Sequence, residues 1–170
     1  MVHIVGDIHQ PLHSCAYFSD KFPKGDRGGN DIKMSYGDKG QVKNLHSLWD
    51  SVLLKVQDNN VMPLDQEGKV YLEKYSKELM KEYTREALDG KLKKNWQFDS
   101  WIMESWRLCK EFVYPSILKD PNPSQDYIRQ GEKIARERLA LAGYRLSDLL
   151  VKFYKGYVDG KSKKFTQESQ

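Results

Sequence analysis

The sequence of 170 residues lacks several features that would assign it to a specialised class of protein. Its two cysteines, Cys15 and Cys109, are too few for a disulfide framework, and they could pair with each other or stay free. No apolar run is long enough to span a bilayer. Asn122 is followed by proline, which excludes it as a glycosylation site. We expect no signal peptide, because Met1 and Val2 lead straight to a histidine-rich segment.

Length and composition predict one domain with a buried core. A chain of this size is long enough for such a core and too short to suggest two domains. A hydrophobic content of 39% beside a charged content of 31% is typical of a soluble globular protein. The net charge of +4 is compatible with phosphate-bearing partners but is also ordinary for a soluble domain, so it does not discriminate between functions.

Apolar periodicity predicts an all-α fold that is interrupted by one loop-rich region. We expect helices over residues 2–10, 44–56, 66–88, 96–118 and 125–154. Pro11 closes the first helix, Asn44 caps the second and Gly90 stops the third. The apolar stripe of the last helix must be buried; it comprises Ile128, Ala135, Leu139, Ala142, Leu146, Leu149 and Phe153.

Residues 14–43 are rich in glycine and form the loop region. Within it, residues 32–36 alternate apolar and polar side chains, which suggests one arm of a short hairpin. We expect a single domain over residues 1–155 and a flexible basic tail over residues 156–170.

Three of the four histidines and two carboxylates form a pattern in the first third of the chain. His3 and Asp7 are four residues apart, and His46 and Asp50 repeat that spacing. On a helix, such residues lie on one face a turn apart, so each pair can direct an imidazole and a carboxylate at one point. Both groups are zinc ligands, and two such helices facing each other would build a site for several zinc ions, which predicts hydrolysis.

The ligands divide between two positions. Asp7 could bind one ion with each oxygen and so hold two metals roughly 3.5–4 Å apart, the spacing used in phosphoryl transfer. His13, His46 and Asp50 would give a further ion three protein ligands and leave positions open for water or substrate. His9 points away from the His3–Asp7 face, which favours a supporting role behind the ligands or a place on the surface.

A different chemistry is less favoured. No Ser/His/Asp or Cys/His set is evident, although Cys15 lies close to His13 in sequence. A structural role for that thiol is the better interpretation, because water activated by a metal needs no side-chain nucleophile. A lone histidine is also more often structural than a ligand, so the hypothesis depends on the whole constellation.

The loop region contains candidate substrate-binding residues. Gly28 and Gly29, followed by Asn30, could let the backbone approach a ligand and donate amides to a phosphate, although a tight turn alone would explain them. Aromatic side chains in the same region could stack on a nucleobase; these are Tyr17, Phe18 and Tyr36. The tryptophans Trp49, Trp101 and Trp106 lie on helical stripes, where a place in the core is more common.

Three sequence blocks together resemble one family. They are His3-Ile4-Val5-Gly6-Asp7-Ile8-His9-Gln10-Pro11-Leu12-His13, then Asp26-Arg27-Gly28-Gly29-Asn30, then Asn44-Leu45-His46-Ser47-Leu48-Trp49-Asp50. In this order and spacing they closely resemble the zinc-dependent class I nucleases of fungi, plants and protozoa. These are single-strand-specific endonucleases with 3′-nucleotidase activity, related in fold to bacterial zinc phospholipase C. Residues 139–146 also resemble the family's C-terminal helix, so the resemblance covers about residues 2–155.

The resemblance implies a role for each ligand. His3 would bind the buried zinc pair and Asp7, the catalytic carboxylate, would bridge it, while His13, His46 and Asp50 would hold the third, more exposed zinc. In the family, a zinc-bound hydroxide attacks the phosphodiester phosphorus and leaves 5′-phosphate products. The implied partners are single-stranded DNA, RNA and nucleotides. The resemblance also implies a monomer without stable membrane association, and a full-length protein that enters the secretory pathway for an extracellular or lysosome-like compartment.

The sequence also departs from the family. Family members begin at a tryptophan that binds zinc, and histidines and an aspartate upstream of the first block complete the buried pair. We therefore interpret this chain as the C-terminal portion of such a nuclease, expected to bind about one zinc and to be weak or inactive. Cys109 resembles a family cysteine whose partner lies in the absent part, which predicts that it is unpaired. The alternatives are a zinc phospholipase C of the same fold and a non-catalytic fragment that binds zinc or nucleic acid.

Overall fold

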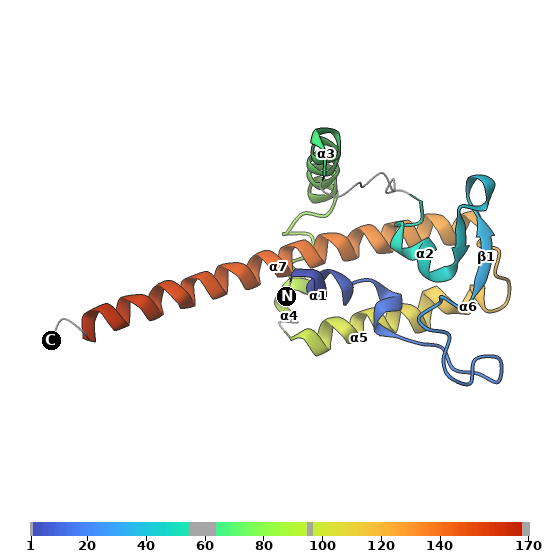
Figure 1. The fold of residues 1–170 in the computed structure, drawn as a ribbon, viewed down its shortest axis with the longest axis horizontal. Coiled ribbons are helices and arrows are strands. Elements are labelled where there is room, and N and C mark those ends of the chain that lie inside the picture. The colour runs from blue at the N-terminus through green and yellow to red at the C-terminus, as the bar shows by residue number, and fades with distance from the viewer. Residues whose placement is uncertain (1, 55–63, 95–96, 168–170) are drawn as a thin grey trace.

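The computed structural model describes residues 2–54, 64–94 and 97–167 (Figure 1). Helices dominate these residues, with one two-stranded sheet, which confirms the predicted all-α class. The elements in chain order are α1 (Val2–Asp7), the 3-10 turn η1 (Pro11–Ser14), β1 (Lys33–Tyr36), the 3-10 turn η2 (Asp38–Gly40), β2 (Val42–Asn44), α2 (Leu45–Asp50), α3 (Gln66–Glu82), α4 (Asp89–Lys94), α5 (Phe98–Leu108), the π-helical turn η3 (Cys109–Val113), α6 (Tyr114–Ile117) and α7 (Gln125–Gln167).

Two long helical segments enclose the N-terminal part of the chain. Figure 1 shows α1 between α7 and α5. α1 packs directly on α7, and η1, which follows α1 in the chain, packs on α5. A small cluster of apolar side chains beneath α1 joins the three elements and consists of Val5, Trp101 and Leu149. Burial of this cluster fixes α1, the helix that carries His3 and Asp7.

The main core lies where α2, the hairpin and η3 meet the first turns of α7. Trp49 is its largest side chain and is almost fully buried. The indole Nε1 of Trp49 donates to the hydroxyl of Tyr127 at 3.0 Å, and that hydroxyl donates to the carbonyl of Val113 at 2.9 Å. Buried indole and phenol groups need such partners. These two hydrogen bonds therefore hold α2 against α7 and η3.

The predicted hairpin and helix cap are confirmed. β1 pairs with β2 in antiparallel register, with Lys33 opposite Asn44. Asn44 ends β2 and caps α2, because its Oδ1 accepts from the amide of Ser47 at 2.8 Å. The hydroxyl of Ser47 in turn lies 3.4 Å from the amide of Asn44, which completes a reciprocal capping box.

The predicted ends of several helices are wrong. The first helix ends at Asp7 rather than residue 10. α2 ends at Asp50, whereas the predicted end near residue 56 lies outside the described residues. After α2, Val52 and Leu53 have φ of 51° and 54°, a left-handed conformation that ends the helix and turns both side chains into the core.

α3 and α4 also differ from the prediction. α3 ends at Glu82 rather than near residue 88, and Gly90 lies inside α4 instead of stopping a helix. The break places Tyr83 and Leu88 in a second apolar cluster with Leu141 of α7. Burial of these side chains therefore overrides the local helical period.

The prediction that Cys109 is unpaired is wrong. The described part of the expected helix over residues 96–118 is an almost continuous rod in which α5 passes through η3 into α6. η3 brings Cys109 next to the chain just after η1, and Cys109 forms a disulfide with Cys15. Neither cysteine is free.

α7 is longer and less covered than its sequence suggests. It continues past the predicted end near Tyr154 to Gln167, and its 43 residues span about 65 Å. Figure 1 shows its C-terminal half projecting beyond the rest of the molecule. The prediction that its whole apolar stripe is buried is wrong, because Leu139 is 42% exposed and Phe153 is 59% exposed. The division into a domain over residues 1–155 and a basic tail stays a prediction.

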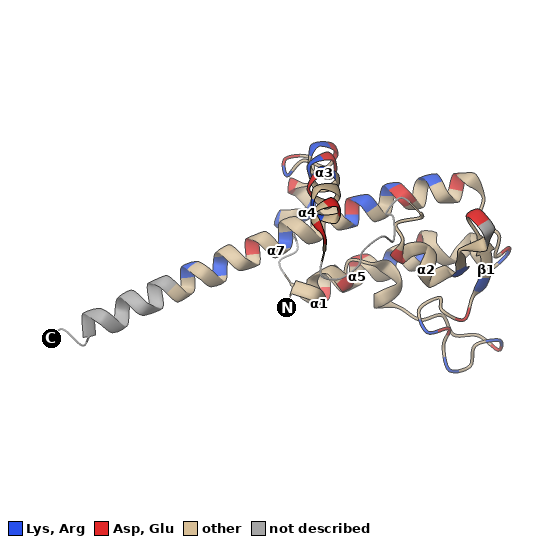
Figure 2. Cartoon of the chain, turned by 45° about the horizontal axis from the view of Figure 1, so that its top comes forward, with Lys and Arg blue, Asp and Glu red and all other residues tan. Residues whose placement is uncertain are grey.

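The surface carries charges of both signs. Figure 2 shows lysine and arginine interspersed with aspartate and glutamate along α3 and α7. None of the helices in the described ranges is both long enough and apolar enough to cross a membrane.

Candidate metal centre

The two predicted His/Asp pairs form on short helices. On α1, Nε2 of His3 lies 2.9 Å from Oδ2 of Asp7. On α2, Nε2 of His46 lies 3.3 Å from Oδ2 of Asp50. The four-residue spacing therefore places each imidazole beside its carboxylate, as predicted.

His13 joins these two pairs. From η1, its Nδ1 lies 3.4 Å from Oδ1 of Asp7 and its Nε2 lies 3.2 Å from Oδ1 of Asp50. Its ring stacks on that of His46, with centroids 4.9 Å apart and planes inclined by 19°. All five predicted ligands thus form one continuous chain of contacts, in the order His3, Asp7, His13, Asp50 and His46.

Three of the five residues make a group that fits a metal ion. One ligand atom from each of His13, His46 and Asp50 lies within 4.8 Å of the others. Two imidazole nitrogens and a carboxylate oxygen are ligand types that zinc accepts, and three protein ligands leave a position open. We call this group the His13–His46–Asp50 cluster. Over the parts of the chain that the structure describes, it is the one group of this kind.

The surroundings of the cluster orient its ligands. Nδ1 of His46 lies 2.8 Å from the carbonyl oxygen of Gly28. Because a carbonyl can only accept, Nδ1 carries the proton and Nε2 presents its lone pair beside Asp50, which is the usual arrangement behind a metal-binding histidine. Gln10 donates from Nε2 to Oδ1 of Asp50 at 2.9 Å and so holds the carboxylate from the other side.

Electrostatics link His13 and Asp50. The hydrogen bond to Asp50 raises the pKa of His13, against a smaller opposing effect of burial. Burial alone would raise the pKa of Asp50, but the hydrogen bonds from His13 and Gln10 outweigh it, and the net pKa is lowered. A proton on His13 would compete with a metal ion for the same nitrogen, so metal binding should weaken at acidic pH.

The His3–Asp7 end of the chain is open to solvent. The side chain of His3 is 87% exposed, compared with 41% for Asp7, 46% for Asp50, 28% for His13 and 21% for His46. Within the described residues, only these two ligands and the shared His13 serve a second metal position. Two ligands, one of them almost fully exposed, bind a metal more weakly than a cluster of three ligands.

The glycine segment is mainly a support for the cluster. Gly28 has φ of +60° and Gly29 has φ of +84°, conformations that favour glycine. The amide of Gly29 donates to Oδ2 of the fully buried Asp26 at 2.9 Å, so this amide is not free for a phosphate. The side chain of Asn30 donates to the carbonyl of Arg27 at 3.0 Å. Substrate contacts by Gly28, Gly29 and Asn30 stay a prediction.

The three aromatic candidates differ in how far each ring is exposed to solvent. Tyr17 is half-buried against Tyr114, with ring centroids 5.5 Å apart. Tyr36 packs partly against the main core. Phe18 is 65% exposed and offers the most accessible ring. Stacking on a base by Tyr17, Phe18 or Tyr36 remains a prediction.

His9 lies in the interior, which excludes the predicted alternative of a surface position. Its side chain is 2% exposed, its Nδ1 donates to the carbonyl of Val5 at 2.7 Å, and its Nε2 lies 2.8 Å from Nη1 of Arg145. Burial, together with the charge of Arg138, lowers the pKa of His9 to about 3, so the ring is neutral. Sequence reasoning missed Arg138 and Arg145, although their positions on one face of the last helix were a signal.

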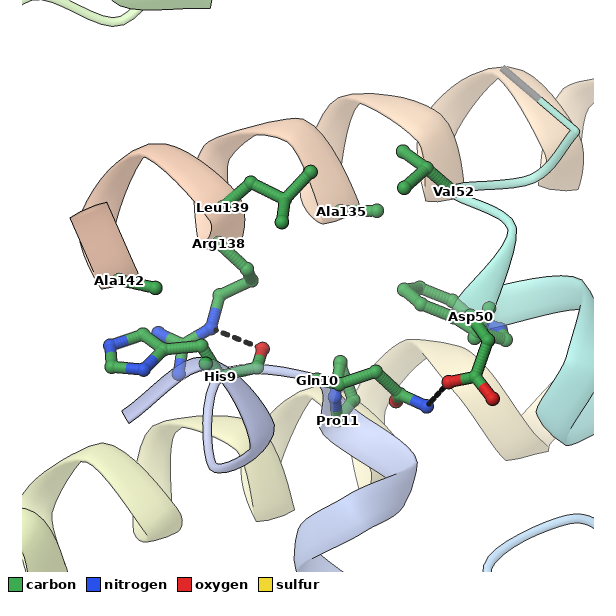
Figure 3. A pocket seen from close by; sticks show the side chains of 11 residues that line it. His9, Gln10, Pro11, Asp50, Val52, Ala135, Arg138, Leu139 and Ala142 are labelled. Carbon is green, nitrogen blue, oxygen red and sulfur yellow. Dashed lines mark hydrogen bonds between the residues drawn. The ribbon is translucent and has the colours of Figure 1, made fainter. Parts of the chain in front are cut away.

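A cavity of about 110 Å³ lies beside the cluster, between α7, α2 and the turn after α1 (Figure 3). Asp50 and Gln10 belong to its lining, and Figure 3 shows the hydrogen bond between them. Most of the remaining lining is apolar and comes from Trp49, Val52, Ala135, Leu139 and Ala142. The cavity thus has a mainly apolar lining with one polar corner, at Asp50 and Gln10 of the candidate site.

Comparison with known proteins gives this geometry its context. The family model described as S1/P1 Nuclease matches residues 1–155. Endonuclease 2 of Arabidopsis thaliana is 28% identical over 160 residues, which are 89% of this chain and 49% of that protein. Nuclease S1 of Aspergillus oryzae is 28% identical over 163 residues, which are 86% of this chain and 50% of that protein. No solved structure matches the chain.

The chain therefore spans about half the length of the curated relatives that it matches. The match runs through both His/Asp pairs, the glycine segment and most of α7. By this match over residues 1–155, the chain belongs to the S1/P1 nuclease family.

Proposed function

We propose that this chain acts in the zinc-dependent hydrolysis of phosphodiester bonds in single-stranded DNA and RNA. The products would carry 5′-phosphates, and 3′-nucleotidase activity would accompany the endonuclease activity. The observation that supports the proposal is the His13–His46–Asp50 cluster, whose ligand atoms converge within 4.8 Å in a member of a nuclease family. The relatives named as nucleases support the class of reaction.

The ligands have distinct tasks in this proposal. His13, His46 and Asp50 would hold one zinc ion, which when bound supplies a Lewis acid toward a phosphate oxygen and toward water. Gln10 keeps Asp50 oriented through its hydrogen bond of 2.9 Å, and Gly28 keeps His46 in the tautomer that binds metal. The exposure of Asp50, 46% for its side chain, leaves the site accessible to a flexible polymer strand.

Asp7 has the second important position. One of its oxygens contacts His3 and the other contacts His13, at 2.9 and 3.4 Å. A carboxylate so placed can offer one oxygen to each of two cations. We assign Asp7 as the carboxylate that links the cluster to a second metal position.

Metal content tests the ligand count. We expect the purified chain to retain about one zinc per molecule after exhaustive dialysis, because only one group of three ligands is complete among the described residues. His46→Ala should remove that zinc. Glu73→Gln is a matched control, because Glu73 forms a similar four-residue pair with Lys77 on α3, a helix that carries none of the five ligands. Three tightly held zinc ions would contradict this stoichiometry.

Product analysis tests the reaction. Denatured DNA should release acid-soluble nucleotides in the presence of zinc, weakly if the second metal position stays unfilled, and Asp7→Asn should abolish the release. Phosphorylcholine release from phosphatidylcholine would instead indicate a phospholipase C. Zinc binding without release from either substrate would indicate a non-catalytic fragment, and cleavage that is indifferent to a chelator would exclude the mechanism.

The compartment is part of the same proposal. The Cys15–Cys109 disulfide supports an oxidising environment such as the secretory pathway, the cell exterior or a lysosome-like compartment. Mass spectrometry of the protein from its native source, before and after alkylation, would test whether this bridge is present there.

A further inference from the structure

A buried cluster of charged groups lies directly behind the segment that carries the metal ligands. Glu104 of α5 accepts from Arg138 at 2.6 Å and from Arg145 at 2.7 and 2.8 Å. The two arginines lie two turns apart on α7 and are 4% and 3% exposed. The side chain of Glu104 is partly buried, at 19% exposed. We call Glu104, Arg138 and Arg145 the buried triad.

The triad and its neighbour Ser105 form hydrogen bonds to the backbone that follows α1. Arg138 donates from Nε to the carbonyl of His9 at 3.1 Å, a bond drawn in Figure 3. Ser105, next to Glu104 in α5, donates to the carbonyl of Ile8 at 2.6 Å and accepts from Arg138 at 2.8 Å. Two successive carbonyls of the turn are thus held by side chains from two other helices.

The ring of His9 provides a third attachment. Its Nδ1 donates to Val5, which leaves Nε2 as the acceptor for Nη1 of Arg145 at 2.8 Å. Arg145 and His9 also both pack on the ring of Trp101, with distances of 5.0 and 5.4 Å. The turn is therefore connected to α7 through one neutral imidazole whose two nitrogens have different partners.

This turn determines where the ligands lie. Asp7 immediately precedes it, and Gln10, which orients Asp50, immediately follows. His13 comes one turn later on η1. A shift of the carbonyls of residues 8 and 9 would move Asp7 and His13 relative to His46 and Asp50, which belong to a different part of the chain.

We propose that the buried triad, acting through Ser105 and His9, positions the turn after α1 so that His13 and Asp7 meet the ligands of α2. This inference rests on the proposed function, because it assigns positioning residues to the same metal centre. A planar guanidinium with several fixed donors suits this task, and a lysine cannot reproduce it. Partners behind metal ligands commonly change metal affinity by about 10- to 100-fold when they are removed.

The experiment compares two substitutions of His9 that each keep one hydrogen bond. His9→Gln retains an acceptor at the position of Nε2 for Arg145, whereas His9→Asn retains a donor at the position of Nδ1 for Val5. Both lose the ring contact with Trp101, so the pair isolates the link to Arg145. Ser105→Ala is a milder third variant that removes the hydrogen bonds to Ile8 and from Arg138 without emptying a large volume.

Zinc affinity, measured by competition with a chromophoric chelator, and the absorption spectrum of the Co²⁺-substituted protein are the readouts. His9→Asn and Ser105→Ala should weaken zinc binding by about 10-fold or more and change the Co²⁺ spectrum. His9→Gln should stay within about threefold of the wild type. Far-ultraviolet circular dichroism and thermal unfolding report the fold of each variant.

Arg85→Gln is the matched control. Arg85 forms a bidentate pair with Asp148 of α7, at 3.0 and 2.6 Å, but contacts neither the turn nor the triad. It should lower thermal stability slightly and leave zinc affinity unchanged. If zinc affinity merely follows the melting temperature across all four variants, or if none of them changes it, the positioning role is refuted. If the wild type binds no zinc, the proposed function itself fails and the inference fails with it.

Discussion

Replacing Gly28 with alanine tests how the loop backbone supports the metal centre. Gly28 has φ of +60°, and its carbonyl accepts from Nδ1 of His46 at 2.8 Å. An added Cβ would lie well inside van der Waals contact with the carbonyl oxygen of Leu12, and 3.3 Å from that of Cys15. Both neighbours are backbone atoms, so only a shift of the loop away from η1 relieves the overlap.

The expected magnitude is the sum of two costs. A left-handed conformation costs an alanine about 1–2 kcal/mol, and forcing extra volume into a packed region typically costs about 1–3 kcal/mol. Gly28→Ala should therefore lower the free energy of unfolding by about 2–5 kcal/mol. In a domain of this size, that corresponds to a fall in melting temperature on the order of 10 °C. Loss of the carbonyl behind His46 should also weaken zinc binding by about tenfold.

Two other glycines separate these costs. Gly25 has φ of +82°, but an added Cβ would meet the end of the Phe18 side chain, at 3.1 and 3.3 Å, and the Cβ of Ala16 at an ordinary contact distance of 3.4 Å. Because Phe18 is exposed and can move, Gly25→Ala should show the conformational cost alone, about 1–2 kcal/mol. Gly143 lies inside α7 with nothing near its Cβ position, so Gly143→Ala should stabilise the protein by about 0.5–1 kcal/mol.

The assay is denaturant unfolding followed by circular dichroism, with zinc affinity measured on the same samples. Gly28→Ala should be the least stable of the three variants and the one variant with weakened zinc binding. Equal losses of stability in Gly28→Ala and Gly25→Ala would show that the Cβ added in Gly28→Ala causes no steric overlap with η1. Zinc binding of Gly28→Ala at wild-type strength would refute the role of the Gly28 carbonyl.

Two further predictions concern acid and reduction. His9 has a pKa of about 3 in the folded protein but about 6.5 when unfolded, so the unfolded chain binds the proton first. Between these pH values, His9 should contribute a loss of about 1.4 kcal/mol of unfolding free energy per pH unit as the pH falls, measured on the chelator-treated protein. His9→Gln should remove that contribution; an unchanged slope in urea titrations from pH 7 to pH 4 would argue against a neutral buried ring. Reduction of the Cys15–Cys109 disulfide, or Cys109→Ser, should lower the unfolding free energy by about 2–4 kcal/mol. Reductant that destabilises Cys109→Ser as much as the wild type would show that the bridge is not the cause.

Features that depend on near neighbours in the chain were predictable. The His3–Asp7 and His46–Asp50 pairs follow from four-residue spacing, and Asn44 caps α2 because its side chain reaches an amide three residues away. The antiparallel hairpin follows from the alternation in residues 32–36. Helix ends were less predictable, because burial of Val52, Leu53 and Tyr83 competes with the local helical period.

Contacts between residues that are far apart in the sequence could not be predicted from local spacing. Cys15 and Cys109 are separated by 94 residues, and the expectation that Cys109 is unpaired came from the resemblance to the family rather than from geometry. The bond between His9 and Arg145 joins residues 136 positions apart. Periodicity cannot reveal such pairs, because it describes which face a residue occupies and not what packs against that face.

By itself, the sequence determined the candidate ligands: imidazoles and carboxylates in two helical pairs, in an all-α chain, with three blocks that resemble a nuclease family. Only the tertiary structure decided that His13 joins those pairs at 3.4 and 3.2 Å, and that a partly buried Glu104 with two buried arginines holds the turn after α1. The physical reason is the distance along the chain over which each effect acts. Helical spacing acts over four residues, whereas the convergence of α1, η1 and α2 requires the packing of α5 and α7 behind them.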